Sequence, residues 1–412
     1  MNENPFNFSK PVKGEYFYNR TKEIENAVGF TKNLQSFSVV GERRIGKTSL
    51  LEHILSEEIL KDHGIDPEKY IIVHFNMGEL YGITKDMLIE TIVEKIRAQE
   101  RIEVNSGNTF EELSAYVAEL GSNGKNLIIA LDEFEVIAPI LNGDFSYWLR
   151  SIFEKPHAMA ITASRITVGE IGSGGTASPL FNIFGNLFLK LFSQKETEKM
   201  ISEMFLRGGV KLDSKEISFL AKLSGGNPYL IQFIGYHYYE EKKGNRRVGE
   251  RKFENEMLDH LRNQFKSYWK YLSQREREFL LGIESAVDNQ IGHVLERKGF
   301  IVSKKGKWRF FSPLFERFIS IKEEEFKDNE KERNRDLYSW IFGVMGLAAL
   351  AIGMRFIMTG IDKLQKLYMG SIAKFVHDPN FVVGLCSLIF SILSFVISLT
   401  SRRRSKQEIH QE

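Results

Sequence analysis

The 412-residue sequence has very little cysteine, since Cys386 is the only one. A lone cysteine excludes an intramolecular disulfide and any cysteine-based zinc cluster. The 9 histidines include no H-E-x-x-H pair, so a zinc-hydrolase motif of that type is excluded as well. The polar start Met1-Asn2-Glu3-Asn4 has no apolar core, and we therefore expect no cleavable signal peptide.

The sequence also lacks an excess of charge of either sign. It carries 56 Lys and Arg against 54 Asp and Glu, which gives a net charge of +2. This balance neither requires nor excludes a nucleic-acid partner. A hydrophobic fraction of 42% is enough for sizeable cores. The length predicts about two to three domains.

The most specific motif is a phosphate-binding loop. Residues Gly41–Thr48 read GERRIGKT, which matches G-x-x-x-x-G-K-[ST] in full. The loop follows the apolar run Phe37–Val40 and precedes the helix-like Ser49–Leu60. In such a loop, backbone N–H groups bind phosphates, Lys47 reaches the β and γ oxygens, and Thr48 offers a hydroxyl to Mg²⁺. The alternative is a strand-to-helix turn with chance glycines.

A second motif ends in two acids. The continuous apolar run Leu127–Leu131 predicts a strand buried on both faces, and Asp132 and Glu133 follow it directly. In a P-loop ATPase, the strand next to the loop ends in an acid that helps to hold Mg²⁺. A second acid can polarise the attacking water. We therefore expect Asp132 to bind Mg²⁺ and Glu133 to act as catalytic base. The alternative for Asp132 is capping of the next helix.

Strands and helices alternate through the first half of the sequence. The predicted strands are Phe37–Val40, Tyr70–Phe75, Leu127–Leu131 and Ala158–Ala163, and the predicted helices are Ser49–Leu60, Ile83–Glu100, Phe110–Leu120 and Phe145–Phe153. This alternation predicts an α/β P-loop NTPase core, a parallel sheet with helices on both faces. We place this core at residues 1–192.

Two smaller parts follow the core. Residues 193–262 predict a helical lid, with a turn at Ser224–Pro228 between two helices. Residues 263–320 predict a winged-helix-like module, in which two helices precede a β-hairpin and a closing helix. The hairpin is basic, with Lys304, Lys305, Lys307 and Arg309 beside Trp308. These cations suit a nucleic-acid backbone. We favour the alternative, a solvated hairpin packed on its neighbour, because the candidate recognition helix is short.

The C-terminal part predicts a membrane hairpin. Residues 321–336 form a charged connector, and Leu337–Met354 and Phe381–Ser401 then carry no charge. Each stretch is close to the ~20 apolar residues needed to cross a bilayer. We therefore expect a two-span transmembrane hairpin at residues 337–401, with the lipid bilayer as a partner. A pair of buried core helices is the alternative.

Flanking charge predicts the orientation of that hairpin. Arg402-Arg403-Arg404 begin a basic tail at residues 402–412, and Lys331, Arg333 and Arg335 precede the first span. Positive residues favour the cytoplasmic side. We expect a multi-pass protein of the cell membrane with both termini in the cytoplasm.

Residues 14–319 resemble the archaeal and bacterial AAA-like P-loop ATPases of the STAND group (signal-transduction ATPases with numerous domains). The resemblance rests on six motifs in order: Tyr18-Asn19-Arg20 with Glu23, Gly41–Leu51, Leu131-Asp132-Glu133, Thr162-Ala163-Ser164, Ser178-Pro179-Leu180-Phe181-Asn182, and Gly225-Gly226-Asn227-Pro228-Tyr229-Leu230. It implies ATP and Mg²⁺ as cofactors. It further implies that the nucleotide is bound by Asn19, Arg20, Gly41, Arg44, Gly46, Lys47, Thr48, Ser49 and Pro228.

The same resemblance implies a sensor 1 group that responds to the γ-phosphate, whereas it assigns no arginine finger. Ser164 occupies the position of the sensor 1 group at the end of a strand, and Arg165 directly after it is a candidate arginine finger. The alternatives are an ordinary strand-end hydroxyl and an ion-paired surface arginine.

These patterns together predict a membrane-anchored ATPase or ATP-driven switch whose effector is the hairpin. A homo-oligomer or an unidentified protein partner is expected. Two alternatives stay open: an ATP-driven remodeller of a membrane or protein partner, and a tethered DNA-binding ATPase that uses the basic hairpin.

Overall fold

The computed structural model describes residues 3–79, 82, 84–100, 110–141, 143–171, 180–243, 248–283, 288–366, 379–380, 383–384 and 386–393. The chain divides into two compact units, Met1–Ile319 and Ser320–Glu412. Of the expectations above, the motif residues Ser178-Pro179, most of the second apolar stretch and the basic tail lie outside the described residues.

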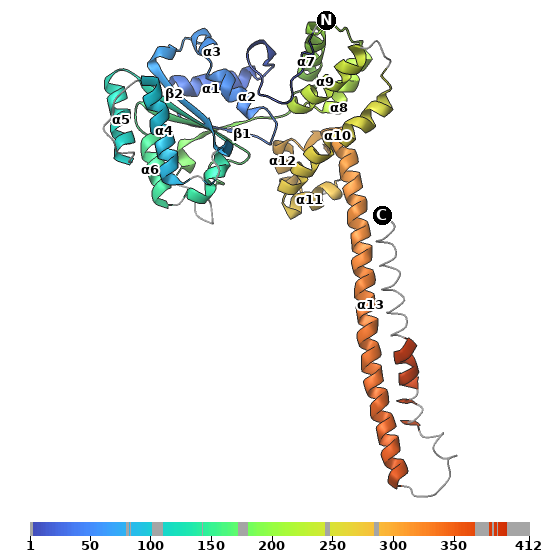
Figure 1. Cartoon of the computed structure of the whole chain (residues 1–412). Helices are drawn as coiled ribbons and strands as arrows, with labels where there is room; N and C mark the ends of the chain where they lie inside the picture. The colour runs from blue at the N-terminus through green and yellow to red at the C-terminus, as the bar shows by residue number, and fades with distance from the viewer. Residues whose placement is uncertain are drawn as a thin grey trace. The chain divides into compact units, whose positions relative to one another are not determined.

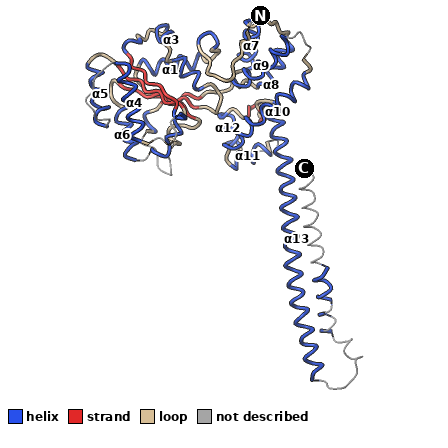
Figure 2. Tube along the Cα trace, viewed as in Figure 1, coloured by secondary structure: helices blue, strands red, loops and turns tan. Residues whose placement is uncertain are grey.

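A five-stranded parallel sheet forms the centre of the first unit (Figures 1 and 2). Its strands are β1 (Phe37–Val40), β2 (Tyr70–Asn76), β3 (Asn126–Asp132), β4 (Ala158–Ser164) and β5 (Gly185–Phe188), in the order β2-β3-β4-β1-β5. Every paired neighbour is parallel. The predicted α/β P-loop NTPase core is therefore confirmed at the level of the sheet.

Side chains of the sheet alternate between two apolar layers. On β3, Leu127, Ile129 and Leu131 pack in one cluster, whereas Ile128 and Ala130 pack in another. The first layer is covered by α4 (Lys85–Glu100), α5 (Phe110–Ser122) and α6 (Gly143–Phe153). The second is covered by α1 (Thr21–Lys32) and α2 (Lys47–Ile54) (Figure 1). Helices thus cover both faces of the sheet. They must do so because successive side chains of β3 point to opposite faces and are buried on both.

One expectation about the sheet order is wrong. We expected the acidic strand β3 to lie next to the loop strand β1, but β4 lies between them. All seven residues of β4 are buried, so this apolar strand suits a central position. The order of the strands in the sequence does not show that β4 lies between β3 and β1 in the sheet. The carboxyl ends of the three strands nevertheless meet at one edge, because all are parallel.

The single predicted helix Ser49–Leu60 is also wrong, because the structure has α2 followed by α3 (Glu57–Asp62). Ser56 has extended backbone angles, φ −71° and ψ 143°, and its hydroxyl accepts the N–H of Ile59. A serine in this conformation begins a new helix rather than continuing the old one. The short 3₁₀ helices of the core are η1 (Gly14–Tyr16), η2 (Pro67–Lys69), η3 (Met77–Glu79), η4 (Phe134–Ile140) and η5 (Phe181–Ile183).

The rest of the first unit is mainly helical. Its elements are α7 (Gln194–Arg207), α8 (Ser214–Ser224), α9 (Pro228–Lys243), α10 (Glu250–Tyr271), α11 (Gln274–Leu281), α12 (Asn289–Lys298), β6 (Ile301–Lys304), β7 (Lys307–Phe310) and the first turns of α13 (Pro313–Lys366), which continues into the second unit. The helix–turn–helix around Pro228 and the hairpin between β6 and β7 lie where the sequence predicts them. The winged-helix designation stays a prediction.

Helix α10 is not predicted by the sequence patterns above. It is 22 residues long and crosses the boundary expected between residues 262 and 263. Its buried side chains belong to the hydrophobic cluster that also holds α7, α8, α9 and the first turns of α13. One cluster therefore joins the expected lid and the expected winged-helix-like module. The bounds of the six expected segments stay predictions.

In the second unit, the charged connector is helical and continues into an apolar stretch of α13. Residues Arg335–Thr359 are long and apolar enough to cross a membrane, and the most apolar 18-residue window has a mean hydropathy of 2.0. Only 11% of that window is buried. Among the described residues, this is the single helix that is long and apolar enough to span a membrane. Of the expected second span, the structure describes only residues 383–384 and 386–393, and these are helical.

The turn at Gly225 gives a test of the lid. Gly225 has φ +58°, and an added Cβ would lie 2.0 Å from the carbonyl oxygen of Phe311. We expect Gly225→Ala to lower the thermal unfolding midpoint well beyond the about 2–4 °C that left-handed strain alone would cost. Gly124→Ala is the matched control, because Gly124 has φ +69° and open space around it. Equal midpoints for the two variants would contradict the packing described here.

Candidate functional site

The phosphate-binding loop joins β1 to α2, and its backbone is held by a hydrogen bond to β4 and turns at a left-handed glycine. The N–H of Gly41 donates to the carbonyl of Ser164 at 3.1 Å, which ties the loop to β4. Gly46 has φ +99°, a conformation that glycine adopts readily, and α2 begins at the next residue. The N-terminus of α2 thus directs unpaired N–H groups into a cavity of 440 Å³. Gly46, Lys47, Thr48 and Ser49 all line this cavity.

Lys47 lies folded back against its own loop. Its ammonium donates to the carbonyl oxygens of Gly41 at 2.8 Å and Glu42 at 3.2 Å. Burial lowers the pKa of Lys47, and the carboxylates of Glu135 and Asp132 act in the opposite direction. A desolvated ammonium surrounded by weak carbonyl partners is well placed to accept phosphate oxygens instead.

Thr48 and Asp132 meet at the edge of the sheet. The Thr48 hydroxyl donates to Oδ2 of Asp132 at 2.5 Å, and Oδ1 accepts the N–H of Glu133 at 2.9 Å. Asp132 is 1% exposed. A buried carboxylate in contact with a hydroxyl beside a phosphate-binding loop is the hard oxygen donor set that Mg²⁺ prefers, so these residues fit the ion. The capping alternative does not apply to η4, because Glu133 rather than Asp132 holds the cap position.

Glu133 has left-handed backbone angles, φ 53° and ψ 42°. For a residue other than glycine this conformation is strained, and such strain is commonly found at functional sites. The carboxylate lies directly over Gly78, where an added Cβ would be 2.2 Å from Oε2. Glu133 therefore points across the carboxyl edge of the sheet and lines the cavity.

Sequence reasoning missed Asn76. This residue ends β2, pairs in register with Asp132, and lines the cavity beside Glu133. Its side-chain oxygen accepts the N–H of Gly78 at 2.8 Å. The available signal was a polar residue at the carboxyl end of a buried parallel strand, which is where such folds place their ligands.

Arg20 and Asn19 precede α1 with consecutive left-handed φ angles of 67° and 61°. Arg20 is 6% exposed and lines the cavity, and its guanidinium donates to the carbonyl of Ile45 at 3.2 Å and to Glu23 at 3.0 Å. Burial lowers the pKa of Arg20, and Glu23 opposes that effect. Arg20 thus braces the loop, whereas Asn19 is not among the described residues that line the cavity.

The lid contributes the far wall of the cavity. Pro228, Tyr229 and Gln232 at the start of α9 all line it. The Arg44 guanidinium lies over the Tyr229 ring, 4.4 Å from its centroid, and joins the loop to the lid. Predicted nucleotide-binding residues from the loop and the lid therefore face one space.

An N-terminal strap, residues 4–13, also closes this cavity and was missed by the sequence analysis. At one end, Phe6 is buried in the lid cluster, and the N–H of Asn7 donates to Gln232 at 2.9 Å. At the other end, the Phe8 carbonyl accepts from Arg44 at 3.2 Å, and the N–H of Val12 donates to the Ser49 hydroxyl at 3.2 Å. The available signal was the Phe6-x-Phe8 pair inside a polar stretch.

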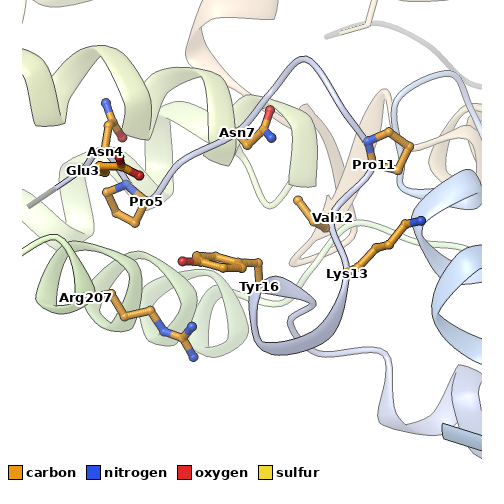
Figure 3. Close-up of a pocket in the computed structure, with 9 residues that line it drawn as sticks. All are labelled: Glu3, Asn4, Pro5, Asn7, Pro11, Val12, Lys13, Tyr16 and Arg207. Carbon is orange, nitrogen blue, oxygen red and sulfur yellow. The ribbon is translucent and has the colours of Figure 1, made fainter. Parts of the chain in front are cut away.

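The strap forms one wall of a second hollow (Figure 3). This cavity of 680 Å³ lies between the strap, Tyr16 of η1 and Arg207 of α7. Arg207 pairs with Glu15 at 2.9 Å and lies 5.3 Å from the centroid of the Tyr16 ring. Asn7, Pro11, Val12 and Tyr16 line both cavities, so the strap separates two hollows that adjoin.

Ser164 and Arg165 are not directed into the cavity. The Ser164 hydroxyl donates to the Ile166 carbonyl. Arg165 pairs with Glu135 at 2.9 Å and lies over the Tyr271 ring, 4.0 Å from its centroid. Neither residue is among the described residues that line the cavity. Their sensor and finger roles stay predictions.

Removal of one aromatic anchor should loosen the strap. The Phe8 ring packs against Phe233 and Tyr236 at centroid distances of 4.9 and 5.2 Å. In Phe8→Ala we expect trypsin to cleave after Lys13 several-fold faster, because proteolysis follows local opening. Tyr147→Ala, at a position 64% exposed on α6, is the control. An unchanged cleavage rate in Phe8→Ala would show that the Phe8 contacts do not hold the strap.

Similar proteins share parts of this architecture. A Walker-type ATPase of Pyrococcus abyssi superposes with a TM-score of 0.53 at 17% identity, over 77% of this chain and 99% of that protein. At this identity the likeness shows the fold alone. The ORC2 protein of Aeropyrum pernix gives a TM-score of 0.45 at 14% identity, over 76% of this chain and 97% of that protein.

A sequence relative is an uncharacterized ATP-binding protein of Methanocaldococcus jannaschii. It is 24% identical over 210 residues, which cover 39% of this chain and 56% of that protein. The chain therefore spans about half the length of this relative. The family described as novel STAND NTPase 2 matches residues 31–287, which is more than half of the chain and includes the loop, the acidic strand and the lid. The chain belongs to this family of P-loop NTPases, the novel STAND NTPase 2 family.

Proposed function

We propose that this protein is an ATPase anchored in the cell membrane by a two-span helical hairpin, and that its nucleotide state acts on the hairpin as a switch. The observation that carries the ATPase assignment is the contact of Thr48 with buried Asp132, beside Lys47 and Glu133 at one sheet edge. A P-loop and two acids in this arrangement have the parts that phosphoryl transfer requires.

Each residue has a role in this mechanism. Lys47 and the N–H groups at the start of α2 hold the β- and γ-phosphates, and Arg20 keeps the loop in shape through the Ile45 carbonyl. Thr48 and Asp132 would hold Mg²⁺, which would neutralise charge on the phosphate oxygens. Glu133 orients a water molecule for attack on the γ-phosphate and accepts its proton.

Two variants test this assignment. We expect Lys47→Ala to lose most ATP binding and turnover, because a buried cation no longer meets the phosphates. Glu133→Gln should retain ATP binding but lose on the order of 10²–10³-fold in turnover. ATP affinity from calorimetry and phosphate release would be measured on the same preparations. Turnover in Glu133→Gln equal to that of the unmodified chain would remove Glu133 from the mechanism.

Packing in the second unit supports the hairpin. In the apolar stretch of α13 the buried positions are Ser339, Gly346 and Gly353, at intervals of seven residues. In the second apolar stretch, Gly384 and Ser391 are buried with the same interval. An added Cβ on Gly353 would lie 3.0 Å from the Gly384 carbonyl oxygen.

Such packing is typical of helices in a bilayer. Small residues at seven-residue spacing allow two helices to approach closely along one seam. The rest of the α13 surface in this stretch exposes large apolar side chains, among them Tyr338, Trp340, Leu347 and Met358. An aqueous environment would not tolerate an apolar surface of that length, whereas lipid would.

Cys386 provides a natural probe of this hairpin, because it is exposed on the second apolar stretch and is the only cysteine. In membrane vesicles, we expect a membrane-impermeant maleimide to label Cys386 only after detergent is added. Lys61→Cys in a Cys386→Ser background is the control, since Lys61 is 62% exposed on α3. It should react without detergent in inverted vesicles. Labelling of Cys386 without detergent would argue against a membrane-buried position.

The basic hairpin keeps a second candidate function open, a tethered DNA-binding ATPase. Lys304, Lys305 and Lys307 are exposed on β6, the turn and β7. The preceding helix α12 adds little positive charge for a nucleic-acid backbone, because Lys298 pairs with Glu276 at 2.6 Å and Arg297 lies over the Phe188 ring. We therefore place the output of the switch in the bilayer, as a signalling or defence effector, rather than on nucleic acid.

A further inference from the structure

The C-terminal end of α10 contacts the loop region at two points. Tyr268 is only 2% exposed, and its hydroxyl donates to the Arg43 carbonyl at 3.3 Å. One turn later, the Tyr271 ring lies 4.0 Å from the Arg165 guanidinium. Residues three apart share one face of a helix, so both tyrosines face the nucleotide-binding core.

Arg165 is held from two sides. Its Nε donates to Oε1 of Glu135 at 2.9 Å, while its guanidinium plane lies over the Tyr271 ring. It directly follows Ser164, whose carbonyl accepts the N–H of Gly41 at the start of the phosphate-binding loop. The arginine therefore lies next to the loop but is engaged by groups outside the cavity.

Glu135 has one paired and one unpaired carboxylate oxygen. Oε1 binds Arg165, whereas Oε2 is buried and has no hydrogen-bond partner among the described residues. Lys47 is also near this pair, because its ammonium donates to the carbonyl of Gly41 at 2.8 Å and the N–H of Gly41 donates to Ser164, the residue before Arg165. A phosphate held by Lys47 would repel Glu135 and attract Arg165.

We propose that Tyr271 is a positioning residue that competes with the terminal phosphate for Arg165. In this scheme, which rests on the proposed function, Arg165 stays on Tyr271 when ADP is bound. The γ-phosphate of ATP draws the guanidinium away from the ring and from Glu135. The end of α10 then loses its charged contact with the core.

The release of Tyr271 would reach the rest of the helical region through aromatic packing. On α10, the Phe265 ring packs on Phe315 and Phe318 of α13, at 5.5 and 5.7 Å between centroids. Tyr268 packs on Phe300 at 5.6 Å. A shift of α10 would therefore be felt both at the β6–β7 hairpin and at the start of α13.

The test compares the affinities of ADP and a non-hydrolysable ATP analogue, the β,γ-imido triphosphate. Both are measured by calorimetry on the full chain in detergent with Mg²⁺ present. In Tyr271→Leu, we expect the preference for the triphosphate over ADP to rise about two- to five-fold, as loss of an exposed cation–π contact predicts. Tyr271→Phe keeps the ring and should leave the preference unchanged. Tyr147→Leu is the control for loss of an exposed tyrosine.

A second substitution separates this role from a structural one. In an Arg165→Met background, Tyr271→Leu should leave the preference unaltered, because the competed cation is absent. An unchanged preference in Tyr271→Leu alone, or the same rise without Arg165, would overturn the proposal while Lys47-dependent nucleotide binding stands. No nucleotide binding by the unmodified chain, or binding unaffected by Lys47→Ala, would overturn the proposed function as well.

Discussion

The contact between Thr48 and Asp132 is the constraint on which the nucleotide site depends. It joins the first turn of α2 to the end of β3, although β4 separates β3 from the loop strand. Only a parallel sheet brings those two ends to the same edge, and only burial of Asp132 makes its carboxylate a strong partner for a hydroxyl or a cation. The loop, the acids and Asn76 are brought together by this one arrangement of strands.

Elements distant in sequence enclose that edge. The N-terminal strap connects the lid to Arg44 and Ser49, and α10 connects the helical region to Arg43 and Arg165. Arg44 and Ser49 are among the predicted nucleotide-binding residues, and Arg165 is the residue for which we propose competition with the terminal phosphate. A site built in this way couples the occupant of the cavity to the surrounding helices, because neither can move without altering contacts to the loop.

Local patterns predicted a large part of this protein. The P-loop, the acidic strand, the helix–turn–helix at Pro228 and the β6–β7 hairpin each depend on residues close together in the chain. The order of the strands, the break of the helix at Ser56, and α10 were not predicted. Strand order and the packing of α10 depend on contacts between segments far apart. At Ser56 the backbone can either continue the helix or begin a new one, and the surrounding packing decides between these two conformations.

The sequence by itself determined the motifs from which we predict phosphate and magnesium binding, since glycine, lysine, threonine and paired acids at fixed spacing have few other uses together. It also determined the apolar stretches near the C-terminus. Tertiary structure alone decided that Ser164 and Arg165 point away from the cavity and that Asn76 lines it. The physical reason is that a side chain takes the best partner available in space. For Arg165 those partners, Glu135 and Tyr271, lie 30 and 106 residues away in the chain.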